Sequence, residues 1–287
     1  MRRKENKIRN NNNRRPREVV VVPWVPKTDL GKKVKNGEVT DIREILNKGQ
    51  IILEPEIVDH LIPDLETDYL LVGQAKGKFG GGKRRIFKQT QKKTREGNKP
   101  KFATMAIIGN KNGLIGIGYG KSKETVPARE KAIRNAKLNI FSIYRGSGSW
   151  ESKKDEPHSI PFAVEGKCSS VKIKLMPAPK GTRLCTEREV AKVLSFAGVS
   201  DVWSKTHGQT RTKMNLIKAC EEALKNLNKT KIQPHHKKDL FIYDGPIAKK
   251  VVKEESVEND NKDQDNKKEK IVEIKKWVKK KSLKRKQ

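Results

Sequence analysis

The sequence has few of the residues that build disulfides, zinc sites or base-stacking platforms. Its three cysteines, Cys168, Cys185 and Cys220, form no CxxC pair, and none of its histidines has zinc-site spacing to a cysteine. We therefore expect a reducing, cytoplasmic location, with no disulfide framework and no bound metal. Aromatic residues make up only 5% of the chain, which argues against reading of single-stranded nucleic acid by base stacking.

Long apolar runs are also missing. No stretch approaches the roughly 18 apolar residues of a membrane span. The N-terminal MRRKENKIRNNNNRRPRE has no apolar segment of the kind found in signal peptides. Because only 33% of the residues are hydrophobic, we expect one or two small domains with charged extensions, and no single core spanning the chain.

Acidic residues are outnumbered by basic ones. Lysine and arginine total 66, aspartate and glutamate total 34, and the formal net charge is +32. A charge of this size needs a polyanionic partner. Nucleic acid is the first candidate, because each neutralised phosphate releases a condensed counterion, and an anionic membrane surface is the second.

Glycine is abundant in GNKNGLIGIGYGKSK, residues 109–123, which looks at first like a phosphate-binding loop. That motif needs a glycine five residues before Gly120-Lys121-Ser122, and the position holds Ile115. The dinucleotide-binding pattern fails too, because Lys121 and Lys123 stand where its third glycine would be. Asn112-Gly113 predicts an antiparallel hairpin here, whereas both motifs belong to parallel βαβ units. The glycines are thus expected to shape a turn, a strand and a strand-to-helix corner.

The first half of the chain predicts a basic tail, an arm and a β-meander followed by a helix. Residues 1–22 are expected to be disordered, and 23–64 to form an arm whose first helix is capped at Thr40-Asp41 and whose second ends at Pro63. A domain over 65–140 is expected to contain three strands and one helix, at Tyr69–Val72, Phe102–Ile108, 114–119 and from Thr125 onward.

The second half predicts a polar linker at 141–154 and an α/β domain at 155–230. Residues 160–164 and 171–175 alternate as a hairpin, with a turn expected at Gly166. Thr186 and Glu189 form a predicted capping box for a helix that Gly198 ends. A loop is expected after Trp203, followed by another helix. Residues 231–287 are expected to be a charged, partly disordered extension.

Candidate RNA contacts are the cations in the basic, glycine-containing stretch up to Lys101 and those at loops and element ends. Loop cations can surround phosphates that a rigid helix face would miss. Lys172 and Lys174 fit an RNA contact and an ordinary polar sheet face equally well. The candidates are Arg84, Arg85, Lys92, Lys93, Arg95, Lys99, Lys101, Lys111, Lys121, Lys123, Arg145, Lys180, Arg183, Lys205, His207 and Arg211.

No catalytic set or cofactor motif is evident in the sequence. His158 and Cys168 could act as base and nucleophile only by an accident of folding, and nothing near Cys168 predicts a lowered thiol pKa. A turn between alternating strands explains Cys168 equally well.

Several segments, spread in order from Trp24 to Leu227, resemble the small-subunit ribosomal protein S-five family, and most of all its archaeal form. The segments are WVPKTDLG (24–31), KKTREGNKPKFATMAIIGNKNGLIGIGYGKSKE (92–124), AIRNAKLNI (132–140), RGSGSWE (145–151), EPHSIPFAVEGK (156–167), LMPAPKGTRL (175–184) and AGVSDVWSKTHGQTRTKMN (197–215).

The resemblance implies an α+β fold, with a double-stranded-RNA-binding-like domain followed by the small α/β domain of this family. It also implies binding to small-subunit rRNA near the channel through which mRNA enters, a role in decoding accuracy, and neighbours of the S-four, S-eight, S-two and S-three families. The family's RNA loop corresponds to Thr94–Phe102. The family usually has a glycine in place of Ser169 and another near Arg183, and Lys76–Phe87 looks like an insertion.

The sequence also fits two rival functions. One is a free-standing RNA-binding protein or RNA chaperone of the same fold. The other is a small-molecule phosphotransferase, because such enzymes share the second domain's fold. The nearest counterpart of their Gly- and Ser-rich ATP loop is PAPKGTRL, which is stiffened by proline and lacks that composition.

Overall fold

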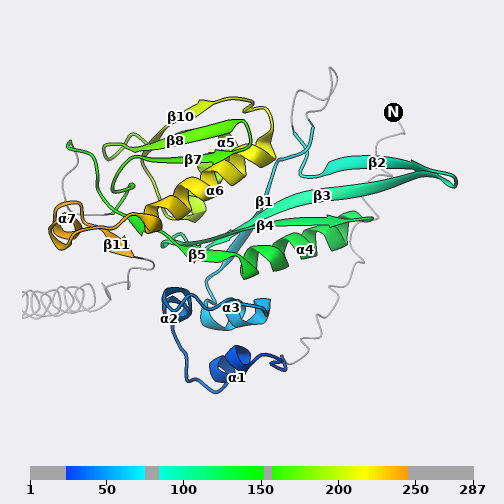
Figure 1. Ribbon diagram of the computed structural model, residues 1–287, viewed down its shortest axis with the longest axis horizontal. Coiled ribbons are helices and arrows are strands. Elements are labelled where there is room, and N and C mark those ends of the chain that lie inside the picture. The colour runs from blue at the N-terminus through cyan, green and yellow to red at the C-terminus, as the bar shows by residue number, and fades with distance from the viewer. Residues whose placement is uncertain (1–23, 75–83, 152–156, 245–287) are drawn as a thin grey trace, which may run out of the picture.

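The computed structural model describes residues 24–74, 84–151 and 157–244 of the chain. Two β-sheets and the helices packed on them stack in layers (Figure 1). The order is helix α4 (Thr125–Leu138), the first sheet, helices α5 (Arg188–Phe196) and α6 (Lys213–Lys229), and the second sheet. This arrangement confirms the predicted α+β class with two sheet-containing domains. The predicted disorder of 1–22 and 245–287 lies outside the described residues.

The first sheet is built around one long strand. This strand, β3 (Gly97–Gly109), pairs antiparallel with β1 (Glu66–Leu70), with β2 (Lys88–Thr94) and with β4 (Leu114–Ser122), and β4 pairs with β5 (Ile140–Ser142). The predicted meander is present as β1, β3 and β4. The expectation of a long basic loop before Lys101 is wrong, because Lys88–Thr94 pairs residue by residue with 97–103. The side chains of β2 show no alternation of apolar and polar residues, so the sequence carried no signal for a strand.

The glycines of β4 face helix α4. A Cβ on Gly118 would lie 2.1 Å from the Ala136 nitrogen and 2.2 Å from the Ala132 oxygen, both of them backbone atoms. Gly116 and Gly120 face the same helix at similar distances, and the alanines of α4 below them are fully buried. The glycines therefore allow β4 and α4 to pack closely along the length of the strand. This role extends beyond the turn and the strand-to-helix corner that were expected.

The antiparallel hairpin predicted at Asn112-Gly113 is present, and its turn spans the four residues 110–113 between β3 and β4. The Asn110 side chain accepts hydrogen bonds from the backbone N–H groups of Asn112 and Leu114, at 2.8 and 3.1 Å. The N–H groups of Lys111 and Gly113 donate to the Phe196 and Ala197 carbonyls at the end of α5. The turn is thus shaped by its contact with the second domain.

The arm has three short helices, α1 (Asp29–Lys35), α2 (Ile42–Asn47) and α3 (Pro55–Leu61). Its apolar residues form a cluster that includes Leu114 and Ile140 of the first domain. The Glu54 carboxylate accepts hydrogen bonds from Trp24 Nε1 and from the Lys27 and Thr28 N–H groups, at 2.9, 2.8 and 2.6 Å. Desolvation acts to raise the pKa of Glu54, but these hydrogen bonds outweigh it and lower the pKa.

The second sheet has the order β7 (Val164–Cys168), β8 (Val171–Pro177), β10 (Val202–His207) and β9 (Leu184–Cys185). The turn expected at Gly166 instead lies at Ser169-Ser170, where Ser169 has φ +57°. Gly166 stays within β7, where a Cβ would lie 2.1 Å from the Ala219 carbonyl oxygen of α6. As in β4, a glycine allows close packing of a helix on a strand.

Two predicted caps differ from the structure. Asp41 stands at the cap position of α2 but makes no side-chain capping bond. The capping box at α5 is absent, because the cap is Glu187, whose carboxylate accepts from the Glu189 and Val190 N–H groups. The Glu189 side chain accepts a hydrogen bond from the Leu71 N–H across the domain boundary, at 2.8 Å. Glu189 therefore bonds to Leu71, a residue distant in the chain, and not to the cap of its own helix.

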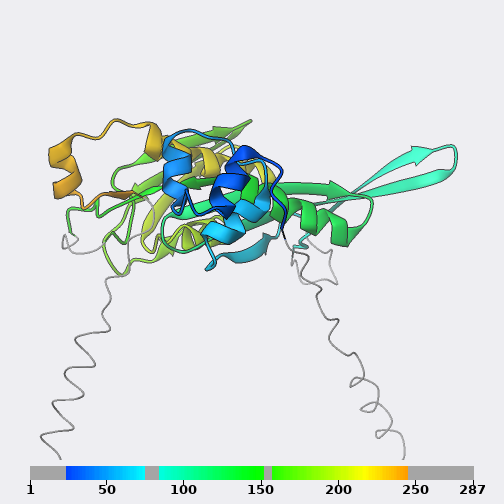
Figure 2. The ribbon, with the colours of Figure 1, turned by 90° about the horizontal axis from the view of Figure 1, so that it is seen from below.

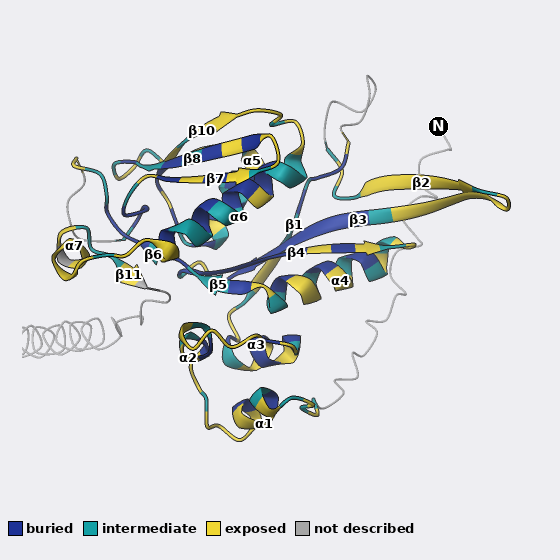
Figure 3. Cartoon of the chain, in the orientation of Figure 1, coloured by how far each residue is buried: buried dark blue, intermediate teal, exposed yellow. Residues whose placement is uncertain are grey.

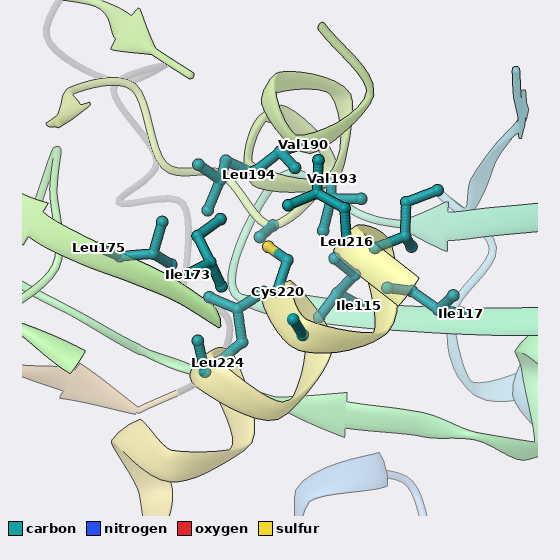
Figure 4. Packing of buried hydrophobic residues seen from close by; sticks show 14 of the residues in the cluster. Ile115, Ile117, Ile173, Leu175, Val190, Val193, Leu194, Leu216, Cys220 and Leu224 are labelled. Atoms are coloured by element: carbon teal, nitrogen blue, oxygen red, sulfur yellow. The ribbon is translucent and has the colours of Figure 1, made fainter. Parts of the chain in front are cut away.

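One continuous hydrophobic core joins the two domains. Ile115 and Ile117 of β4 point toward residues of α5 and α6, whose other side chains meet Ile173 and Leu175 of β8 (Figure 4). Cys220 lies fully buried among them. Burial and the neighbouring Glu221 raise the pKa of its thiol to about 12. The two domains therefore fold against each other, and α6 contributes to both.

The beginning of the C-terminal extension is part of the fold. Helix α7 (Pro234–Asp239) leads to β11 (Tyr243–Asp244), which pairs antiparallel with β6 (Tyr144–Arg145) in the linker. The Ser147 N–H also donates to the Leu240 carbonyl at 2.8 Å. Residues 231–244 of the charged extension are thus ordered, because the linker supplies backbone partners. No helix in the described part of the chain is long and apolar enough to cross a membrane.

Candidate nucleic-acid interface

The most prominent basic feature is the hairpin of β2 and the outer part of β3, which we call the basic ribbon (residues 88–102). It projects beyond the rest of the molecule (Figure 2), and both of its strands are exposed (Figure 3). Thr94 pairs with Gly97, so Arg95 and Glu96 form the turn at its tip. Glu96 forms an ion pair with Lys99 at 2.5 Å. The ribbon thus presents its cations from a regular strand ladder.

The register separates the cations between the two faces of the ribbon. Lys92 lies opposite Lys99, and Thr90 opposite Lys101, so these three lysines share one face. The same face continues onto β4, because Ala103 lies opposite Lys121. Lys93, opposite Asn98, lies on the other face.

At the inner end of the ribbon a depression collects further cations. It is lined by Lys101, Lys121, Lys123 and Lys131, with Glu124 as the acid among them. Lys131 was missed in the sequence, because it lies within α4 and only the tertiary fold brings it to this place. The structure thus brings five predicted contacts together, Lys92, Lys99, Lys101, Lys121 and Lys123.

Packed aromatic rings hold the base of the ribbon. Phe87 and Phe102 meet edge to face, with 6.4 Å between ring centroids. The Arg129 guanidinium of α4 lies over the rings of Phe87 and Tyr69, at 4.9 and 5.5 Å. Arg84 is half-buried and donates to the Gly73 and Arg211 carbonyls, whereas Arg85 is exposed. The base of the ribbon is therefore fixed by packed side chains of β1, β3, α4 and the segment before β2.

A second group of cations lies in the loop between β8 and β9. Lys180 and Arg183 are exposed there. Arg183 adopts a left-handed conformation, φ +63°, where the family resemblance implies a nearby glycine. The buried Asp201 carboxylate accepts hydrogen bonds from the Gly181 and Arg183 N–H groups, at 3.2 and 2.7 Å. These bonds offset the strain of a non-glycine residue at positive φ.

The cations expected in the loop after Trp203 lie in two kinds of structure. Lys205 and His207 belong to strand β10, opposite Lys174 and Lys172. The expectation of a loop at these positions is wrong, because they pair with β8. Arg211 lies in the loop before α6 and is exposed. Lys205 and His207 are therefore side chains of a sheet face.

Two further candidates, Lys111 and Arg145, take part in contacts within the protein. Lys111 is exposed, but its amine forms an ion pair with Glu66 at 2.5 Å. Arg145 is 5% exposed, and its guanidinium donates to the Asn112 side chain and the Gly198 carbonyl. Burial lowers the pKa of Arg145 to about 10. Its placement does not support contact with RNA, because its side chain fastens the linker to the β3–β4 turn and to the end of α5.

His158 has buried polar partners. His158 Nδ1 lies 2.9 Å from Asp201 Oδ2, and its Nε2 lies 3.5 Å from the Ser147 hydroxyl. This order matches a hydrolase triad, but the three residues are only 8%, 4% and 3% exposed, and a nucleophile must reach its substrate. Asp201 also holds the loop of Lys180 and Arg183, so the network positions that loop. In the described residues, no group of three His, Cys, Asp or Glu side chains could hold a metal ion.

Comparison with known proteins identifies the family. Residues 86–144 match the model of the ribosomal protein S5 N-terminal domain, and 166–236 that of the C-terminal domain. The protein "Small ribosomal subunit protein uS5" of Nanoarchaeum equitans is 45% identical over 81% of this chain and 100% of its own length. The proteins of that name from Methanocaldococcus jannaschii and Methanococcus maripaludis are 45% and 43% identical, over 78% of this chain and 96% and 93% of theirs. The chain therefore belongs to the uS5 family of ribosomal proteins, in its archaeal form.

Proposed function

We propose that this protein is a structural constituent of the small ribosomal subunit in the cytoplasm, where it binds rRNA mainly through the basic ribbon. The observation that carries the proposal is the basic ribbon itself, which projects from the molecule and exposes a row of cations on paired strands. Relatives that match nearly their whole length are named small ribosomal subunit proteins. A role within a large RNA also accounts for the formal charge of +32.

The ribbon suits recognition of folded RNA by its backbone. Lys92, Lys99 and Lys101 stand along one face, and Arg95 reaches out from the tip. Such a ladder can follow phosphates without reading bases. Lys121 and Lys123 extend the contact to the depression at the inner end of the ribbon. Lys93 and Arg85 would meet RNA on other sides of the ribbon, and Lys180, Arg183 and Arg211 would add contacts from the second domain.

The finer placement follows from the family resemblance. We expect the protein near the channel through which mRNA enters the subunit, where it supports decoding accuracy and contacts mRNA. Proteins of the S-four, S-eight, S-two and S-three families are the expected neighbours. Neither rival function gains support. A free-standing RNA chaperone does not account for relatives named as subunit proteins, and PAPKGTRL lacks the features of an ATP loop.

The test replaces Arg95, Lys99 and Lys101 with glutamine. We expect weaker binding to small-subunit rRNA and a salt dependence flattened by about 0.7–0.9 unit of slope for each lost phosphate contact. The matched control replaces Lys32, Lys33 and Lys48, exposed lysines of the arm, and is expected to have a smaller effect. A salt slope that the ribbon variant leaves unchanged would exclude the ribbon as the phosphate site.

Sedimentation of cell extracts separates the ribosomal function from its free-standing rival. The wild-type protein is expected with the small subunits. Recovery only in free fractions would overturn the ribosomal proposal, whatever the RNA affinity of the purified protein.

A further inference from the structure

The outward face of the second sheet is a second basic surface, on the side away from α5 and α6. Val171, Ile173 and Leu175 of β8 point into the core, so Lys172, Lys174 and Met176 point outward. The outward residues of the neighbouring strands stand beside them in three rows. The rows are Lys167–Lys172–His207, Glu165–Lys174–Lys205 and Met176–Trp203–Cys185.

The first two rows oppose like charges. Lys172 faces Lys167 on one side, and Lys174 faces Lys205, an arrangement that destabilises a sheet. Lys174 pairs with Glu165 at 3.1 Å, but among the described residues Lys167, Lys172 and Lys205 have no ion pair. Lys167, Lys172 and Lys205 thus have no charge partner in the described part of the fold, and the arrangement points to an external anion.

The third row adds an exposed indole. Trp203 is 42% exposed, between Met176 on β8 and Cys185 on β9. The next row of the sheet is Pro177–Val202–Leu184, in which Pro177 ends β8 and Leu184 begins β9. The loop that joins β8 to β9, with Lys180 and Arg183, therefore begins directly beyond Trp203. The indole thus has Lys174 and Lys205 on one side and the loop cations on the other.

We propose that this face is a second RNA site, which binds a single-stranded segment with one unpaired base stacked on Trp203 and the flanking phosphates on the cations of both sides. The scarcity of aromatic residues excludes a platform for several bases, but one base needs only one indole, and cations spaced along strands follow a backbone. An acidic protein fits less well, because the row Met176–Trp203–Cys185 is too small to form the core of an interface. The choice of RNA as the anion rests on the proposed function.

The experiment measures binding of the full-length protein to a fluorescent oligouridine. Trp203→Ala is expected to weaken binding about five- to 150-fold, the effect of losing one stacked base. Trp203→Phe should restore most of the affinity. Trp150→Ala is the matched control, because Trp150 is 91% exposed and lies in the linker, outside the strands of the second sheet. Lys172→Gln with Lys205→Gln should flatten the salt slope by about 0.7 unit for each lost contact.

Equal affinities for Trp203→Ala and Trp150→Ala would overturn the proposal. So would displacement of the RNA by polyglutamate at equal charge, because the face would then bind any polyanion. Circular dichroism checks that each variant is folded. Sedimentation keeps the two proposals apart. A protein that sediments with small subunits while Trp203→Ala binds oligouridine normally refutes the second site alone. A protein found only in free fractions, with oligouridine binding that depends on Trp203, refutes the ribosomal function alone.

Discussion

The two halves of strand β3 belong to one continuous strand but have opposite surroundings. From Ala103 to Gly109 every residue is buried, between α4 on one face and the second domain on the other. From Gly97 to Lys101 every residue is exposed, and among the described strands this outer half pairs with β2 alone. The inner half supplies the packing, and the outer half supplies the cations. Because an isolated two-stranded hairpin is marginal in water, we infer that the outer half depends on the inner half for its order.

The largest effect is expected from filling the space between the inner half of the sheet and α4. Gly118→Ala would place a methyl group about 2 Å from backbone atoms of Ala132 and Ala136, which cannot rotate away. We expect the free energy of unfolding to fall by about 2–3 kcal/mol, in the range of overpacked cores. Chemical denaturation measures it. Asn98→Ala in the outer half is the control, with an expected change under about 0.5 kcal/mol. Equal effects at the two sites would contradict the comparison.

A smaller effect is expected where the two halves meet. Arg129→Met keeps most of the aliphatic bulk but removes the cation over Phe87 and Tyr69. We expect a loss of about 1 kcal/mol in the free energy of unfolding, together with faster hydrogen exchange of the amides of the ribbon. Arg134→Met on the exposed side of the same helix serves as the control. Unchanged exchange in the ribbon would show that its base is held by other contacts.

The smallest effect, of opposite sign, is expected in the outer half. Lys92 lies opposite Lys99, so Lys92→Gln removes a like-charge pair and leaves the Glu96–Lys99 ion pair intact. We expect a gain of up to about 0.5 kcal/mol, which is larger at low salt than at high salt. Lys93→Gln, opposite Asn98, is the control. A loss of stability from Lys92→Gln would mean that the ribbon needs this lysine for its own fold.

The sequence predicted the elements whose pattern is local. Alternation predicted the outward lysines of β8, and Asn112-Gly113 correctly predicted an antiparallel hairpin in the glycine run. It could not predict β2, because a strand of lysine, glutamine and threonine with no buried face carries no periodic signal. The capping box failed because Glu189 has a better partner in Leu71, more than a hundred positions away.

The candidate site divides in the same way. The cations of the ribbon were found from composition alone, although their role in binding RNA stays a prediction, as do the domain boundaries. Arg145 could not be separated from them, because nothing around it in the sequence indicates its hydrogen bonds to Asn112 and Gly198. The sheet face around Trp203 was likewise hidden, since its rows join residues from four separate strands.

The sequence by itself determined the charge, the absence of disulfide spacing and the family to which the chain belongs. These depend on residue identities and their order, which need no partner. The tertiary structure alone decided which glycines meet a helix backbone, which arginine is buried and which cations share a face. Those outcomes depend on segments far apart in the chain that come into contact only when both domains close over one core.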